Sequence, residues 1–364
     1  MQYTNSLFML FCGMGQLIFG PLSDRFGRLR IIQISLSIFI IANTLCYFAA
    51  DYPTLLIGRI LQAIGACGSY LCCFATIRDI YDCDEQSAAM FSYLNIANSI
   101  SAIIAPTLGT IIGAAFGWQN IFSTLAITCA LTYSYYQLLA VETAPMEKLA
   151  NNNQNIVADY YRVFTHINYQ LFTLPAAIGF GTFFAYYCIS SYLYIEIMGF
   201  TPMQYGMLYG TCGLTFFIGS YVCGQSIHRL GILNTLFIGL AINATGTLLM
   251  LAGYLCFQTT HILLIHPAII LMIWGASFMV GAGIGGTMAP FKDIPGTTFA
   301  MISCYKFIGA HSVGDVVMYF YNGTPVSLAI TILLLNVLST GLLYYYQKGI
   351  TYNRQSTVSD SISE

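Results

Sequence analysis

Long stretches of this chain contain no charged side chain, and this feature constrains the fold more than any other. Residues 31–50, 86–141 and 230–291 contain no Asp, Glu, Lys or Arg, although the last of these blocks includes two histidines. A membrane-spanning helix needs about 20 mostly apolar residues, whereas a spanning strand needs about 10 alternating ones. Backbone groups in lipid must be paired within their own segment. The sequence therefore predicts an all-α integral membrane protein.

The composition excludes several other classes of protein. Of 364 residues, 57% are hydrophobic and 7% are charged, where a soluble domain has about 25% charged residues. The formal net charge is −2 and the mean hydropathy is +0.72. An ordinary soluble enzyme, a nucleic-acid binder with a basic face and a disordered chain are all excluded. Most of the 12 cysteines lie in apolar blocks without metal-ligand spacing, so we expect no metal and no cofactor.

Gly, Pro and charged residues divide the chain into about eleven predicted spans. A polar segment at 142–167 separates five spans from six, so we predict an N-terminal half at 1–141, a cytoplasmic central loop at 142–167, a C-terminal six-helix half at 168–347 and a cytoplasmic tail at 348–364. The spans are 4–22, 31–49, 54–76, 87–112, 118–140, 169–195, 203–226, 231–255, 263–289, 298–320 and 326–346.

The basic residues predict how the spans are oriented. Ten of the 12 Lys and Arg residues follow odd-numbered spans, and the other two, Arg59 and Lys306, lie within spans. Under the positive-inside rule the odd-numbered loops and the C-terminus are cytoplasmic. An odd number of spans then places Met1 outside, with no signal-peptide features before the first span.

The loop after the first predicted span has an ordered pattern, GPLSDRFGR. Gly20 and the following proline are expected to break the helix at the membrane surface, and Gly27 permits a tight reversal. Asp24 is expected to accept hydrogen bonds from a helix N-terminus or to pair with a cation. Arg25 and Arg28 lie where they meet the anionic inner leaflet. One interpretation is a basic turn that only sets topology; the other is a loop that gates movement.

Several motifs together carry a resemblance to a known family. The loop at 20–28 resembles the signature loop of the major facilitator superfamily, and GRILQAIG at 58–65 is similar to its fourth-helix motif. APTLG at 105–109 is similar to the fifth-helix signature of its drug/proton antiporter branch. With GWQNIF at 117–122 and VET at 141–143, the chain looks most like the Bcr/CflA-type drug-resistance transporters of bacteria.

The resemblance implies a fold and an activity. It implies a bundle of twelve helices in two halves around a central cavity, of which this chain lacks the first helix because Met1 falls just before the second. It implies proton-coupled efflux of drugs or small amphipathic molecules by alternating access. The partners it implies are a small-molecule substrate, protons and the lipid bilayer, with no nucleic acid. We expect a monomer in the bacterial inner membrane.

Four residues of the N-terminal half are candidate site or bending positions. Arg59 and Gln62 share one helical face, and a charge there is costly unless it faces a cavity or a partner. Arg59 either organises the substrate cavity and proton coupling, as the resemblance implies, or caps carbonyls of a neighbouring helix. Pro106 and Gly109 are expected to allow helix bending and close approach of helices.

The tenth predicted span contains His311 and Asp315, four residues apart and so on one helical face. Such a pair in lipid could relay a proton, since imidazole titrates near neutral pH. The alternatives are a hydrogen-bonded tie between helices and a solvated contact for Asp315. Lys306 is about 140° to 180° around the helix from these two residues and cannot join them in one cluster.

Other function classes receive less support from the sequence. No P-loop GxxxxGK[ST] is present, so direct ATP coupling is not expected. GxSxG and HExxH motifs are also missing, which disfavours an intramembrane enzyme. An uptake symporter of the same superfamily is disfavoured by the fifth-helix signature. A truncated, inactive transporter remnant is the remaining alternative, because the first helix is expected to be absent.

Overall fold

The structure is a computed structural model, and the residues that it describes are almost entirely helical. These residues are 2–80, 100–101, 104–105, 108–143, 156–258, 261–291, 294–321 and 323–362. Long helices occupy ten of the eleven predicted spans. The remaining span, 87–112, lies partly outside the described residues, which are helical at 100–101, 104–105 and 108–116.

The N-terminal half contains four helices with defined bounds. They are α1 (Gln2–Phe26), α2 (Arg28–Tyr47), α3 (Tyr52–Ile80) and α5 (Gln119–Leu139). Helix α2 packs along both α3 and α5, and α1 packs along α3. A cluster of buried apolar side chains lies between them, including Phe19, Ile31, Leu36 and Leu71.

The C-terminal half contains the other long helices. They are α8 (Ile167–Ser191) with the π-helical turn η1 (Tyr192–Ile197), α9 (Pro202–Leu230), α10 (Ile232–Phe257), α11 (Ile262–Met288), α12 (Pro295–Tyr319) and α13 (Val326–Ile362). Seven helices of the described chain are long and apolar enough to cross a membrane by length and composition. They are α2, α3, α8 with η1, α9, α10, α11 and α13. Helix α1 contains a shorter apolar stretch, Leu7–Ser23.

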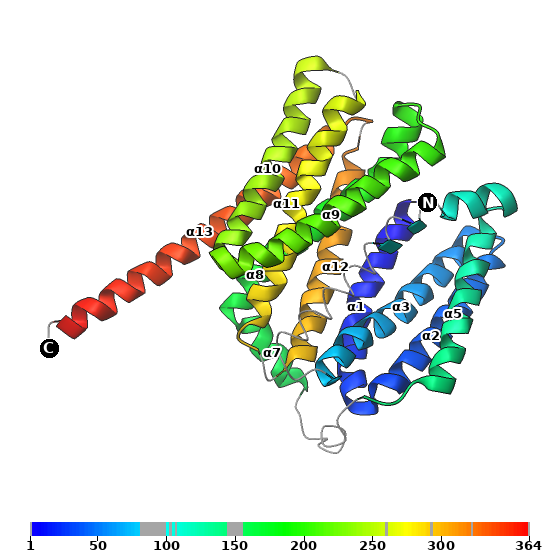
Figure 1. The fold of residues 1–364 in the computed structure, drawn as a ribbon, viewed down its shortest axis with the longest axis horizontal. Coiled ribbons are helices and arrows are strands. Elements are labelled where there is room, and N and C mark those ends of the chain that lie inside the picture. The colour runs from blue at the N-terminus through cyan, green and yellow to red at the C-terminus, as the bar shows by residue number, and fades with distance from the viewer. Residues whose placement is uncertain are drawn as a thin grey trace.

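The two halves lie side by side and meet along α1 and α12 (Figure 1). The basic ends of α1 and α3 lie on one side of the bundle, the lower side in Figure 1, where α7 (Ile156–Thr165) also lies. Helix α7 falls inside the segment that the sequence predicted as a central loop. Its Val163 is buried against α8 and α12, so this part of the connection is packed rather than solvated.

Helix α1 does not end at Gly20 and Pro21, as the sequence predicted, but continues to Phe26. Pro21 has no N–H to donate to the carbonyl of Leu17, four residues earlier. The hydroxyl of Tyr160 on α7 donates to that carbonyl at 3.0 Å. A residue far along the chain thus satisfies the acceptor that the proline leaves open, and the helix continues past it.

Candidate functional site

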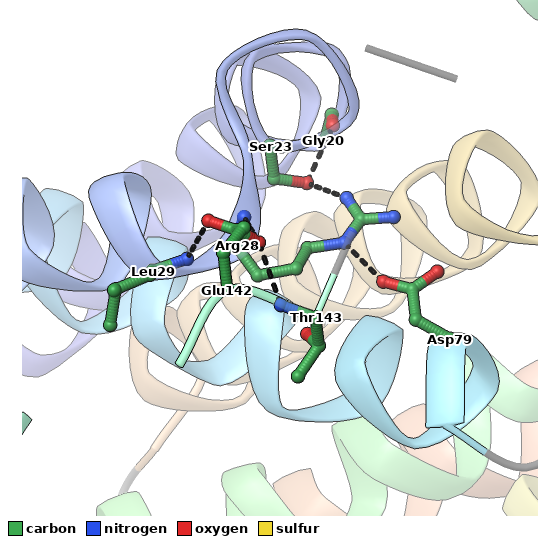
Figure 2. A network of polar contacts seen from close by, with 7 residues as sticks. All are labelled: Gly20, Ser23, Arg28, Leu29, Asp79, Glu142 and Thr143. Carbon is green, nitrogen blue, oxygen red and sulfur yellow. Dashed lines mark hydrogen bonds and ion pairs between the residues drawn. The ribbon is translucent and has the colours of Figure 1, made fainter. Parts of the chain in front are cut away.

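A network of polar contacts joins the signature loop to two other segments of the N-terminal half (Figure 2). Nε of Arg28 lies 2.8 Å from Oδ2 of Asp79 at the end of α3, and Arg28 also donates to the hydroxyl of Ser23 at 2.7 Å. The Ser23 hydroxyl donates to the carbonyl of Gly20 at 2.9 Å. The two ionic side chains are only 6% and 3% exposed. Arg28 therefore links α2 to α3 through a buried ion pair and α2 to α1 through the hydrogen bond to Ser23.

Glu142 caps the N-terminus of α2 from a distance of more than a hundred residues in sequence. Its carboxylate accepts hydrogen bonds from the backbone N–H groups of Arg28 at 2.8 Å and Leu29 at 3.0 Å. The first N–H groups of a helix have no partner within the helix, and a negative charge there is favourable. Glu142 also accepts from the N–H of Thr143 at 3.1 Å, which fixes the carboxylate beside α2 (Figure 2).

Gly27 makes this capping possible. It has φ +90° and ψ 158°, a conformation essentially restricted to glycine. A Cβ at Gly27 would lie 2.5 Å from Oε2 of Glu142, so any side chain at this position would collide with the capping carboxylate. The tight reversal predicted for Gly27 is therefore present. The backbone of Gly231 before α10 has nearly the same φ and ψ, +81° and 165°, which repeats the turn in the C-terminal half.

The other signature-loop residues have different environments. Arg25 is exposed in the last turn of α1, and its guanidinium lies 5.6 Å from the centroid of the Phe26 ring. The side chain of Asp24 lies outside the described part of the structure, so its predicted hydrogen bonding stays a prediction.

Arg59 and Gln62 are brought together as the sequence predicted, and a third residue joins them. NH1 of Arg59 donates to Oε1 of Gln62 at 2.5 Å, and Nε2 of Gln62 donates to Oδ1 of the buried Asn43 on α2 at 2.8 Å. The guanidinium also lies 4.7 Å from the centroid of the Phe8 ring on α1 and is within electrostatic reach of Tyr187 on α8. Arg59 thus lies where the N-terminal half faces the C-terminal half.

His311 and Asp315 also meet, on one face of α12. Nδ1 of His311 lies 3.5 Å from Oδ2 of Asp315, and the side chains are 19% and 39% exposed. Burial of the pair is therefore partial. A Cβ on Gly314, the residue before Asp315, would lie 3.7 Å from the sulfur of Cys188, which places this turn of α12 beside α8. Its role in proton transfer stays a prediction.

Of the two predicted bending positions, only Gly109 lies among the described residues. Pro106 lies outside the described residues. At Gly109 a Cβ would meet no atom within 4 Å in the part of the chain that the structure describes. Close approach of a helix at Gly109 therefore stays a prediction.

Sequence reasoning missed a hydrogen-bonded network in the C-terminal half. The hydroxyl of Tyr194, in η1, lies 2.7 Å from Nδ1 of His266 on α11. Nε2 of His266 lies 2.9 Å from the hydroxyl of Thr211 on α9. The only sequence signal was a histidine within an apolar block, and nothing in the sequence named its partners. The network joins three helices near the ends opposite α7.

Comparison with known families and proteins places these features in context. A family model described as Major Facilitator Superfamily matches residues 1–337. A chloramphenicol resistance protein from Pseudomonas aeruginosa is 25% identical over 317 residues, which cover 87% of this chain and 74% of that protein. Multidrug resistance protein D from Escherichia coli is 24% identical over 310 residues, which cover 85% of this chain and 77% of that protein. Multidrug resistance protein MdtL from Shigella dysenteriae is 27% identical over 317 residues, which cover 84% of this chain and 75% of that protein.

Two solved structures share the fold. The human organic anion transporter MFSD10 has a TM-score of 0.74 at 16% identity, covering 94% of this chain and 83% of that one. The xylose transporter XylE from E. coli, in a partially occluded inward-open conformation, has a TM-score of 0.70 at 14% identity, covering 95% and 86%. At these identities the likeness concerns the fold alone.

Proposed function

Because the chain belongs to the Major Facilitator Superfamily and is therefore a secondary membrane transporter, we propose that it exports drugs or small amphipathic molecules in exchange for protons. Members of this superfamily are transporters rather than enzymes, and they bind small-molecule substrates within a membrane. The names of the bacterial relatives, chloramphenicol resistance and multidrug resistance, support the proposed substrate class.

The observation that carries the mechanism is the network around Arg28. Alternating access requires each half of the molecule to move as a unit against the other. The Arg28–Asp79 ion pair and the Glu142 cap hold α1, α2 and α3 together at one end of the N-terminal half. The proposed gating role of the signature loop follows, since movement of α2 is transmitted to its neighbours rather than absorbed in the loop.

Proton coupling is proposed for the intramembrane charges that border the interface between the halves. Asp315 with His311 supplies a partly exposed carboxylate and an imidazole. Arg59 lies on the opposite half, beside the Phe8 ring and facing Tyr187. An antiporter needs one site whose protonation changes substrate affinity, because coupling is a reciprocal free energy between two ligands.

The proposed setting is the inner membrane of a bacterium, with the chain acting as a monomer. The basic residues of the odd-numbered loops support a cytoplasmic location for the ends near α7 and for the C-terminus. Ten long helices occupy the spans from which this orientation was predicted, and α13 continues beyond the predicted end of its span at 346 to Ile362.

Accumulation of radiolabelled chloramphenicol in everted membrane vesicles tests the proposed activity. With a proton gradient, acid inside, we expect accumulation above that of vesicles without this chain, and its loss when an uncoupler removes the gradient. Accumulation only in right-side-out vesicles would instead indicate an uptake symporter. No accumulation in either orientation, with the protein present in the membrane, would indicate an inactive chain.

A further inference from the structure

Lys306 on α12 is a buried cation with no anionic partner among the residues that the structure describes. The residue is 5% exposed, and its ammonium nitrogen lies 4.9 Å from the ring centroid of Phe180 on α8 and 5.3 Å from that of Phe307. Among the described side chains, none makes a hydrogen bond or an ion pair with this nitrogen. Aromatic rings stabilise a cation through their negative faces, but they replace only part of its lost hydration.

Two neighbouring polar side chains are also buried without a hydrogen-bond partner among the described residues. Gln16 on α1 is fully buried, and neither its amide nitrogen nor its amide oxygen has a hydrogen-bond partner among the described residues. Ser303 on α12 is also fully buried, and its hydroxyl has no partner there. Buried polar groups in proteins are nearly always hydrogen-bonded, so such a set indicates a place for a ligand.

The packing of α1 on α12 places these three residues at one level. A Cβ on Gly13 would lie 3.0 Å from the carbonyl oxygen of Cys304, and a Cβ on Gly20 would lie 3.0 Å from the Cβ of Ala300. Gln16 lies one turn from both glycines, so it is opposite the stretch of α12 that contains Ser303. Ser303 and Lys306 are three residues apart and are neighbours on the helix surface.

Aromatic rings from both halves border this place. Phe180 and Phe307 have ring centroids 5.4 Å apart, and Phe307 lies 6.5 Å from Tyr70 of α3 in an edge-to-face arrangement. Tyr70 in turn lies 4.9 Å from Phe74. The rings extend from α8 across α12 to α3, so they span the interface between the C-terminal and N-terminal halves.

The charged residues nearby have other positions or partners. Asp315 is nine residues further along α12, about 13.5 Å at the helical rise, and it meets His311. Arg59 donates to Gln62 and lies over Phe8. The described helices that pack around Lys306 therefore place hydrogen-bond donors and aromatic rings near it, but no carboxylate.

We propose that Lys306, Ser303 and Gln16 form a subsite for the carboxylate of an aromatic substrate, whose ring packs among Phe180, Phe307 and Tyr70. The ammonium, the hydroxyl and the amide nitrogen all supply N–H or O–H donors, and a carboxylate only accepts. An anion also supplies the counter-charge that the buried lysine lacks. The inference deepens the proposed transport function, on which it rests, by naming aromatic acids as a substrate class.

Equilibrium binding to the detergent-purified chain tests the subsite, with tritiated 2-naphthoate as the probe and 2-naphthamide as a neutral competitor of the same shape. We expect saturable naphthoate binding, with the amide at least tenfold weaker. Lys306→Gln should weaken naphthoate binding at least tenfold, Lys306→Arg should retain most of it, and Ser303→Ala should weaken it severalfold. Thr298→Val is the matched control, since Thr298 is equally buried on α12 but donates to the carbonyl of Ile294.

Three results would each overturn the subsite: no saturable naphthoate binding to the unmodified chain, equal competition by the amide, or unchanged affinity in Lys306→Gln. If Lys306→Gln does not fold, as judged by size-exclusion chromatography, the comparison of acid with amide on the unmodified chain decides. Binding in detergent needs no proton gradient, and the vesicle assay uses chloramphenicol, which is not an acid. Failure of the subsite is therefore distinguishable from failure of the proposed efflux.

Discussion

Arg28 and Asp79 form a buried ion pair, with Nε and Oδ2 2.8 Å apart, although 51 residues separate them in the sequence. The pair joins the start of α2 to the end of α3, beside the Glu142 carboxylate that caps α2. The same arginine thus receives a carboxylate at its side chain and another at its backbone. Removing either carboxylate has a separate, measurable consequence.

Asp79→Asn should destabilise the protein because it removes the carboxylate that pairs with the buried Arg28 guanidinium. Breaking a buried ion pair by removing one partner costs about 3–5 kcal/mol. The measurement is the thermal unfolding of the purified protein in detergent. Asp51→Asn is the control, because Asp51 is exposed at the other end of α3. Equal melting temperatures for the two variants would show that the ion pair contributes nothing to stability.

Gly27→Ala should lower stability more than Gly231→Ala does. Both glycines have a φ that other residues rarely adopt, which costs about 1–3 kcal/mol for an alanine. At Gly27 the added Cβ meets the Glu142 carboxylate, whereas at Gly231 it meets no atom of the described residues within 4 Å. Displacing the cap adds about 1–2 kcal/mol. The measurement is the melting temperature of each variant. A larger decrease for Gly231→Ala than for Gly27→Ala would contradict the capping role of Glu142.

Tyr160→Phe should destabilise the contact between α7 and α1. It leaves the carbonyl of Leu17 without a donor, because Pro21 cannot supply one. An unsatisfied buried acceptor costs about 1–3 kcal/mol. Tyr161→Phe is the neighbouring control, since Tyr161 is 70% exposed. Denaturation should show a lower free energy of unfolding for Tyr160→Phe and an unchanged one for Tyr161→Phe. An unchanged value in both variants would mean that water replaces the Tyr160 hydroxyl.

Single cysteines at Arg30 and Thr201, in a cysteine-free background, should react with a membrane-impermeant thiol reagent from opposite sides of the membrane. Both positions are exposed, and they lie after the first and the sixth predicted spans. The basic residues predict that the Arg30 side is cytoplasmic. Labelling is measured in intact cells and in everted vesicles. Reaction of both cysteines in intact cells would refute the orientation.

Asp315→Asn should abolish the dependence of efflux on the proton gradient while leaving the protein folded. The change keeps the shape of the side chain but removes the group that we propose to titrate with His311. Chloramphenicol accumulation in everted vesicles, measured with and without the gradient, gives the result. Ser312→Ala, an exposed change in the same turn, is the control. If Asp315→Asn still responds to the gradient, His311 and Asp315 are structural and coupling belongs to other residues.

Much of the architecture could be predicted because hydropathy is a local property. The charge-free blocks at 31–50 and 86–141 predicted helices without knowledge of any contact, since a helix in lipid pairs its own backbone groups. The turn at Gly27 was also predictable, because the conformation depends on one residue and its neighbours. His311 and Asp315 met as predicted, since a spacing of four residues fixes their common face.

The contacts between distant segments could not be predicted in this way. Nothing near Pro21 indicates that helix α1 continues, because the donor to Leu17 is the hydroxyl of Tyr160 on another helix. The sequence of α2 does not indicate a role for Asn43, because its partner, Gln62, lies on α3. Glu142 ends an apolar span, and its partners at the start of α2 precede it by more than a hundred residues.

The sequence by itself determined that this protein is a membrane-embedded helical bundle, where its helices run and how its signature loop turns, because these properties depend on hydropathy and on local backbone preferences. Only the tertiary structure decided which carboxylate pairs with Arg28, and that Lys306, Ser303 and Gln16 are buried at the interface between the halves with no hydrogen-bond or ion-pair partner among the described side chains. The physical reason is that burial and electrostatic pairing depend on distances in space, and helix packing sets those distances between residues far apart in the chain.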